Sequence, residues 1–320
     1  MAYTIYRSTD AGAPTLSGNT ASLIPLLDAV LVNGYGSKPA AGWTKPFSGT
    51  NKAVYRNAAN AIARSYFRVV DSTTNRFAKV RGYDTMTDVD TGTGAFPLTS
   101  DITGDGLSIP KSSVLDGTSR QWIVAADERT LVLFIQYNNT HWDMTYLGDG
   151  IPDVAGNSNF SILAARQNES NDWNIALTMF GLNPTSYIEK GNYLKGIYGV
   201  SGSRLYRVFS GPNVDSAIRE YSHTMSTIGG YLPMPNDGSI YLFQPPLTIY
   251  TGTFWHRQGV YRLIYVPVHQ PAAFSHGDTF NGVGALSGKS FEIIKPVITH
   301  AGSGSLSTNG PVALVTSNPD

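Results

Sequence analysis

The feature that most constrains the fold is the distribution of glycine and proline, which interrupt the chain at short intervals. The 33 glycines and 18 prolines of the 320 residues are spread along the sequence rather than clustered. Between them lie short runs rich in β-branched and aromatic side chains, which is the pattern of many strands joined by turns. We therefore predict a mainly β protein with a few helices (α+β), whose short antiparallel strands form sandwich- or barrel-like sheets.

The apolar runs place the predicted strands along most of the chain. They lie at residues 66–70, 122–125, 131–136, 160–164, 174–179, 205–209, 240–243, 247–250, 261–266, 291–294 and 312–315. The runs 122–125 and 131–136 are separated by a short polar loop, which predicts a hairpin. Because both arms carry apolar residues on each face of the pleat, we expect this hairpin to be central in its sheet.

Two segments have the periodicity of helices. The first is an N-terminal amphipathic helix over Leu23 to Val32, with Thr20 as its cap and Gly34 at its C-terminal end. We expect it to pack against a strand at residues 52–56, with Gly34, Gly36 and Gly42 supplying the turns between them. The second helix is predicted near residues 212–227, where proline and aspartate precede apolar residues at helical spacing.

The length allows two domains or one large β unit. The polar stretch 148–159 is the best candidate for a boundary, which gives an N-terminal α+β domain at 1–150 and a C-terminal β-rich domain at 151–320. A single β-rich unit is the alternative. The last twenty residues begin with glycine and serine, regain a short strand and end polar, so they could form an arm that pairs with a neighbour.

Charge and cysteine content exclude several classes of function. The 23 basic and 23 acidic residues balance, and charged residues make up only 14% of the chain. A protein that binds nucleic acid through phosphates needs a local surplus of Lys and Arg, so we expect no direct nucleic-acid partner. Low charge also removes repulsion between copies and favours association. With no cysteine, disulfides, thiolate metal sites and a catalytic thiol are excluded.

No membrane or secretion segment is expected. The first ten residues lack the basic start and apolar run of a signal peptide, and no stretch approaches the roughly 20 apolar residues that cross a bilayer. We therefore expect the chain to be made and folded in a cytoplasm.

Two motifs resemble ligand loops without meeting their requirements. Gly284 to Ser290 has one residue too few between its glycines for a phosphate loop and continues into a strand-like run, so we predict a tight turn. Asp101 to Gly106 resembles the start of a calcium loop, but its twelfth position is Ser112 rather than a glutamate. We predict a polar turn there, as for the acidic pairs Asp88/Asp90 and Asp149/Asp153.

No catalytic constellation is recognisable in the sequence. The six histidines include no pair at i, i+4 on a helix, and a Gly-x-Ser-x-Gly elbow is absent. His276 with Asp278, and Glu189 or Glu292, could be named as bases and acids, but no partnered nucleophile accompanies them. We predict a protein that is not an enzyme, with no catalytic residue, metal ligand or cofactor; an envelope-degrading enzyme is the weakest alternative.

Large aromatic side chains are the remaining candidates for contact. Trp43, Trp142, Trp255 and Tyr35 are predicted as interface or glycan contacts, because aromatic rings stack on sugars and fill subunit interfaces. The alternative is that they fill the core. For Trp43 and for Phe47 we favour the core.

Three stretches together resemble a family of tailed-bacteriophage virion proteins. They are residues 13–56 (without 19–22), residues 80–92, and residues 263–269 with 277–282 and 284–289. The resemblance implies a structural component of the particle, and it carries no catalytic residues. It does not distinguish head, connector and tail.

We therefore expect a non-enzymatic virion protein, made in the bacterial cytoplasm and present in several copies. Its expected partners are copies of itself and other virion proteins, with the tail or baseplate slightly preferred over the head. A capsid decoration or head-spike protein is one alternative. A host-surface adhesion module that binds glycan through Trp and Tyr is the other, and no membrane partner is expected.

Overall fold

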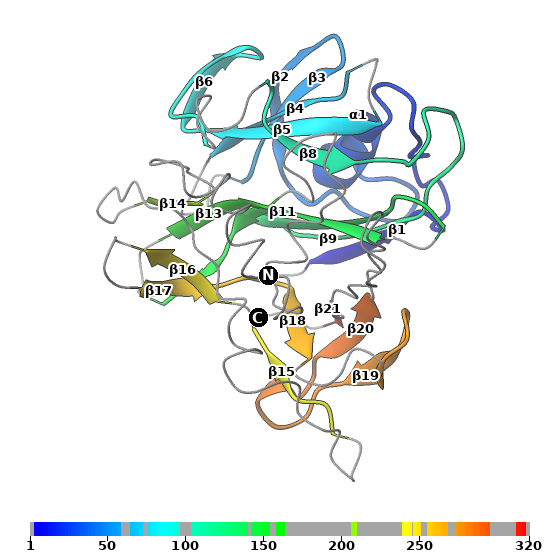
Figure 1. The fold of residues 1–320 in the computed structure, drawn as a ribbon, viewed down its shortest axis with the longest axis vertical. Helices are drawn as coiled ribbons and strands as arrows, with labels where there is room; N and C mark the ends of the chain where they lie inside the picture. Colours follow the sequence, from blue (N-terminus) through cyan, green and yellow to red (C-terminus); the bar gives the residue numbers. More distant parts are fainter. Residues whose placement is uncertain are drawn as a thin grey trace, which may run out of the picture.

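The computed structural model describes residues 3–58, 65–72, 76–96, 104–139, 142–153, 158–163, 206–209, 239–244, 246–250, 255–267, 273–294 and 312–317. In this part the protein is mainly β, with antiparallel sheets and one short α-helix, which confirms the predicted fold class. Figure 1 shows a six-stranded sheet lying between a five-stranded N-terminal sheet and the C-terminal strands.

The six-stranded sheet is the middle layer, and all its neighbouring strands are antiparallel. In spatial order its strands are β1 (Thr4–Arg7), β9 (Trp122–Ala126), β10 (Thr130–Gln136), β11 (Trp142–Asp149), β13 (Ser158–Leu163) and β14 (Tyr206–Phe209). The predicted central hairpin is confirmed as β9 and β10, with Leu131 opposite Ala126. Its residues are buried almost throughout because other layers cover both faces of the sheet.

The N-terminal sheet covers one face of the six-stranded sheet (Figure 1). Its order is β2 (Thr44–Gly49), β3 (Lys52–Arg56), β4 (Tyr66–Val70), β5 (Phe77–Tyr83) and β8 (Leu107–Pro110), and the hairpin of β6 (Thr85–Asp88) and β7 (Thr91–Thr93) projects beside it. Buried residues of this sheet and of β9 to β11 belong to one apolar cluster, so the two sheets share a core.

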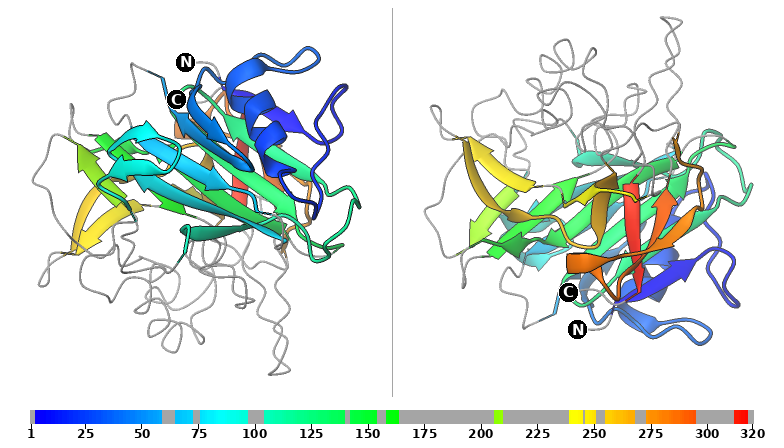
Figure 2. Two further views of the ribbon diagram at one scale, coloured as in Figure 1. Left: turned by 90° about the horizontal axis from the view of Figure 1, so that it is seen from above. Right: turned by 90° about the horizontal axis from the view of Figure 1, so that it is seen from below.

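The C-terminal strands lie against the opposite side of the six-stranded sheet. One sheet contains β15 (Leu242–Phe243), β18 (Ile264–Pro267), β21 (Val312–Ser317), β20 (Ser290–Ile294) and β19 (Thr279–Asn281), in that order. A smaller sheet contains β12 (Ile151–Pro152), β17 (Trp255–Val260) and β16 (Pro246–Tyr250). In the view from below (Figure 2, right), β21, in red, lies inside its sheet.

This position of β21 corrects the interpretation of the C-terminus as an arm. The strand pairs with β18 on one side and with β20 on the other, and its first four residues are buried. Four consecutive apolar residues, Val312 to Val315, need cover on both faces, and the chain's own sheet supplies it.

The predicted division at residue 150 falls inside the six-stranded sheet. Strand β11, which ends at Asp149, pairs with β13, which begins at Ser158. The main core cluster also joins Tyr146 and Leu147 to Ile264 and Leu314 from the C-terminal half. Residue 150 therefore does not separate two independent cores. The predicted helix at 212–227 and the strand at 174–179 lie outside the described residues.

The N-terminal helix is present where the sequence predicts it. Helix α1 (Leu23–Leu27) continues as a π-helical turn (Asp28–Asn33), and its buried face packs in the main core. The Tyr55 hydroxyl on β3 lies 2.9 Å from Asp28 Oδ1 and 3.2 Å from the Ile24 carbonyl oxygen, which confirms the predicted contact with strand 52–56. Gly34 ends the helix with a φ of 74°, a conformation that favours glycine.

The predicted cap of this helix is wrong. Ser22, not Thr20, precedes the first helical residue, and neither hydroxyl caps it: Ser22 donates instead to the Ser17 carbonyl oxygen at 2.7 Å. The amide of Leu23 donates to Asp71 Oδ2 at 2.8 Å, from the residue that follows β4. The first amide of the helix, which has no partner within the helix, is therefore satisfied by tertiary structure rather than by the local sequence.

The first ligand-like motif forms a turn, and of the second only residues 104–106 are described, where the chain also turns. Gly284–Leu286 is a 3₁₀ turn that leads into β20 at Ser290, as predicted. At the second motif, Asp105 accepts from Arg68 at 2.7 Å, and Asp90 pairs with both Arg68 and Lys52. In the described part of the chain no three His, Asp or Glu side chains are grouped so as to hold a metal ion.

A tight contact between β5 and Phe96 gives a test of this packing. Gly82 exchanges two backbone hydrogen bonds with Phe96, and a Cβ at Gly82 would lie 2.2 Å from a ring carbon. We expect Gly82→Ala to lower the free energy of unfolding by about 1–3 kcal/mol, because the buried ring must move. Urea titration measures this. Gly117→Ala is the control, since its Cβ would meet nothing closer than Asn19 Nδ2 at 3.4 Å; equal stability of the two variants would contradict the packing.

Candidate functional site

Trp43, the first predicted contact residue, lies in the core. Its side chain is 3% exposed, and its ring packs edge-on against Phe67 with centroids 5.2 Å apart. The indole Nε1 donates to the Asp127 carbonyl oxygen at 2.7 Å. Phe47 is half-buried and stacks on Tyr66. Trp43 therefore has little ring surface to offer to a partner.

Trp142, at the start of β11, is also covered. It is 6% exposed, and the ring of His276 stacks on it with centroids 4.8 Å apart and an interplanar angle of 27°. Burial lowers the pKa of His276 below its usual value, although Glu292 opposes this shift. A sugar could reach this indole face only if His276 moved away.

Tyr35 is half-buried in the loop after the helix. Its ring lies 5.9 Å from Tyr6 and 6.3 Å from Trp122, and its hydroxyl donates to Asp10 Oδ2 at 2.9 Å. Burial, followed by the hydrogen bond to Asp10, raises the pKa of the Tyr35 hydroxyl far above its usual range. The backbone of Trp255 belongs to β17, and its side chain lies outside the described residues.

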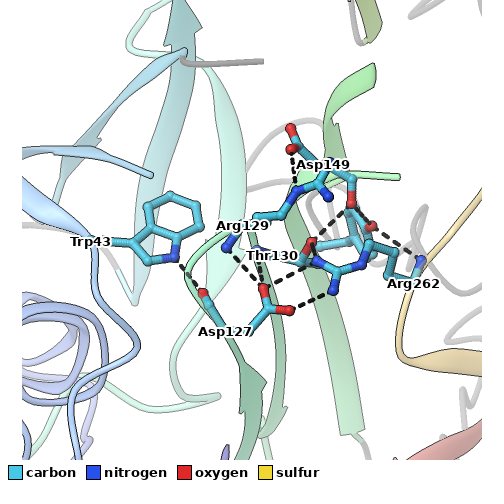
Figure 3. Close-up of polar contacts among 7 residues, drawn as sticks. Trp43, Asp127, Arg129, Thr130, Asp149 and Arg262 are labelled. Carbon is cyan, nitrogen blue, oxygen red and sulfur yellow. Dashed lines mark hydrogen bonds and ion pairs between the residues drawn. The ribbon is translucent and has the colours of Figure 1, made fainter. Parts of the chain in front are cut away.

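These aromatics do not form one site, because Trp43, Trp142 and Tyr35 each contact a different set of residues. The most elaborate polar arrangement in the described residues is elsewhere, at the β9–β10 turn, and we call it the Asp127 network (Figure 3). Its members come from the β9–β10 turn, from β11 and from the residues before β18: Asp127, Arg129, Thr130, Tyr146, Asp149 and Arg262.

Asp127 is the centre of this network. Its Oδ1 accepts from the amides of Arg129 and Thr130, each at 2.8 Å. The guanidinium of Arg262 binds both carboxylate oxygens, with Nη2 2.6 Å from Oδ2 and Nη1 3.1 Å from Oδ1. The side chains of Asp127 and Arg262 are 1% and 7% exposed, so this is a buried, two-pronged ion pair.

Asp149 is the second acid of the network. Its Oδ2 accepts from Arg129 Nε at 2.9 Å, while its carbonyl oxygen accepts from the hydroxyls of Thr130 and Tyr146 at 2.9 and 2.5 Å. Gly148 allows this close approach, since it has a φ of 118° and a Cβ there would lie 2.2 Å from the Arg129 carbonyl oxygen. The sequence predicts only an ordinary polar turn at Asp149 and Asp153.

Burial controls the chemistry of Asp149. Its Oδ1 and the neighbouring Arg129 Nη2 have no hydrogen-bond partner in the described structure. Burial raises the pKa of Asp149 to about 7, against the opposing effect of Arg129. The network can therefore hold or release one proton near neutral pH. Its hydrogen-bonding members include no histidine and no serine.

The network joins the middle sheet to the C-terminal sheet. Arg262 precedes β18, and a second ion pair, between Arg7 of β1 and Glu292 of β20, links the same two sheets at another point. Neither pair could be predicted from sequence, because each joins residues more than a hundred positions apart.

A scan against protein-family models and a search of curated proteins found no match to this chain. In the described residues no helix is long and apolar enough to cross a membrane.

Removing Arg262 should destabilise the protein strongly. We expect Arg262→Met to lower the free energy of unfolding by about 3–5 kcal/mol, because it leaves the buried carboxylate of Asp127 without its cation. Chemical denaturation measures the loss. The matched control is Lys45→Met, which breaks the ion pair with Asp28 whose side chains are 30% and 20% exposed; we expect a change below about 1 kcal/mol there. Similar losses in both variants would contradict the network.

The raised pKa of Asp149 predicts a pH dependence. Between about pH 4, the ordinary pKa of aspartate, and about 7, the folded protein keeps a proton that the unfolded chain releases. Its contribution to the free energy of unfolding therefore falls as pH rises through this window and is constant above it. Asp149→Asn cannot ionise, so we expect its stability relative to the natural protein to increase from pH 4 to 7.

Urea unfolding at intervals across this range gives the difference between the two proteins. The exposed Asp116→Asn is the control and should show no such trend. A difference between Asp149→Asn and the natural protein that stays constant with pH would show that folding does not raise the pKa of Asp149.

Proposed function

We propose that the chain is a non-enzymatic structural component of a tailed-bacteriophage virion, present in several copies and contacting other virion proteins. The tail or baseplate is preferred over the head. The basis is the resemblance of three sequence stretches, together with where these stretches lie in the fold.

The resembling stretches include both core and surface. Residues 13–56 contain the helix, the turns after it and the β2–β3 hairpin. Residues 80–92 run from β5 into the β6–β7 hairpin, and residues 263–269 contain β18. The remaining stretch, residues 277–282 with 284–289, contains β19 and the turn that leads to β20.

The observation that carries the proposal is the exposure of this last stretch. Strand β19 is the edge of the C-terminal sheet, and Thr279 and Asn281 on it are exposed. Val283, which follows, is 80% exposed. An edge strand offers backbone donors and acceptors to another chain, and an exposed apolar side chain beside it adds buried area on contact. The β19 edge, residues 279–283, is therefore a suitable surface for a neighbouring subunit.

Mass spectrometry of purified particles tests the proposal. In virions of the phage that encodes the chain, we expect its peptides at several copies per particle. Particles without the chain would refute a virion role. Antibody labelling viewed by electron microscopy distinguishes the tail from the head. Label on the tail supports the preferred location, whereas label on the capsid alone would make the protein a head decoration.

The β19 edge has its own test. Val283→Asp places a charge at a side chain that is 80% exposed, so we expect unchanged thermal unfolding but reduced incorporation into particles. Leu115→Asp is the matched control, because Leu115 is also exposed, at 54%, but lies in the loop after β8. We expect the control to be incorporated normally. Normal incorporation of Val283→Asp would exclude this edge as a subunit contact.

A further inference from the structure

Lys111 and Asp71 form a fully buried pair in the N-terminal sheet. Asp71 follows β4 and Lys111 follows β8, with β5 between these strands. Both side chains are 0% exposed, and Lys111 Nζ is in direct contact with Asp71 Oδ1. Lysine and aspartate are rarely buried completely, since removing both charges from water costs more than their attraction usually returns.

The surroundings of the pair offer few hydrogen bonds to two charged groups. The ammonium of lysine has three donors, and the described acceptors are Asp71 Oδ1 and the Asn19 carbonyl oxygen, the latter at 2.6 Å. The other carboxylate oxygen, Oδ2, accepts from the Leu23 amide at 2.8 Å. Apart from the pair itself, the described contacts amount to one acceptor beside Nζ and two backbone amides, those of Leu23 and Ala21, beside the carboxyl group.

One acceptor beside the nitrogen and one donor beside the oxygen are what a secondary amide requires. Its N–H would donate to the Asn19 carbonyl oxygen, and its carbonyl oxygen would accept from the Leu23 amide. Both polar groups of the product would be satisfied, and no charge would remain in the core.

We propose that Lys111 and Asp71 are joined by an intramolecular amide bond in the folded protein. The lone pair of the neutral Lys111 amine attacks Cγ of the protonated Asp71 carboxyl group and forms the C–N bond. The C–Oδ1 bond breaks, Oδ1 leaves with its proton and with one proton from nitrogen, and one water molecule is released. No oxidant, reductant or other reactant is consumed, and the charges of the two side chains disappear together.

Two features of the site favour this reaction. Burial raises the pKa of Asp71, although Lys111 opposes the shift, so the neutral acid is more accessible than for an aspartate in water. The Leu23 amide also points at Oδ2, where negative charge develops when nitrogen attacks. Folding holds the two reacting groups in contact, which replaces an encounter in solution.

The bond would close a covalent loop between residues 71 and 111 in a chain that has no cysteine. Because Asp71 also binds the first helical amide, the link would fix the start of α1, the end of β4 and the end of β8 to one another. This inference does not depend on the virion role, since it concerns the isolated chain.

The intact mass of the purified, denatured full-length chain tests the bond. We expect the mass to be lower than that of the sequence by one water molecule. Lys111→Met removes the amine while keeping an unbranched apolar side chain, so we expect this variant to have the full mass of its own sequence. If the natural chain has its full sequence mass, the pair is an ion pair only and the proposal is wrong.

Peptide mapping excludes the other reaction that would lower the mass by one water molecule. A succinimide at one of the Asp–Gly bonds also loses water, but hydroxylamine opens a succinimide and leaves an amide intact. Trypsin cannot cleave after an acylated lysine, so we expect residues 69–76 to be joined to residues 82–120 in one branched peptide. Separate linear peptides ending at Lys111 and at Arg76, together with a succinimide that hydroxylamine opens, would overturn the proposal.

Discussion

The three layers of the protein meet at Asp127. Its carbonyl oxygen binds the Trp43 indole from the chain that leads into the N-terminal sheet, and its carboxylate binds Arg262 from the chain that leads into the C-terminal sheet. Asp127 itself lies in the turn of the central β9–β10 hairpin. Because apolar packing is non-directional, it can cover a sheet in more than one orientation. Directed hydrogen bonds from both sides of one residue select a single arrangement of these layers.

The stability of this arrangement depends on a few charged side chains that are buried in the interior. The side chains of Asp127 and Asp149 are at most 1% exposed and that of Arg262 is 7% exposed, in a chain whose charged residues are only 14% of the total. Each buried charge costs free energy unless its partner is present, so the loss of one partner costs more than the pair contributes. These contacts therefore do less to raise the free energy of unfolding than to raise the free energy of structures in which the sheets pair wrongly.

Sequence reasoning located the strands better than the contacts between them. The β9–β10 hairpin and the N-terminal helix were predictable because alternating apolar residues, turn residues and helical spacing are local signals. The helix cap was not predictable, since the Leu23 amide binds Asp71, which follows β4. The sequence predicts a boundary at 148–159 because charged, Gly and Asn residues interrupt the apolar runs there, whereas in the structure Gly148 permits a close backbone approach and Asp149 binds Arg129 in the Asp127 network. The burial of Trp43 was favoured from sequence and is confirmed, whereas Trp142 carries no sequence signal that separates a buried ring from an exposed one.

The edge strands of the sheets affect how copies of the chain would associate. Strand β2 is the exposed edge of the N-terminal sheet, but it contains Pro46, a register shift between Thr44 and Phe47, and a lysine paired with Asp28. These features hinder the addition of another strand. Strand β19 has no proline and no charged residue, and its pairing with β20 is regular. If copies associate by strand addition, as low net charge favours, the C-terminal sheet rather than the N-terminal sheet is the side that admits it.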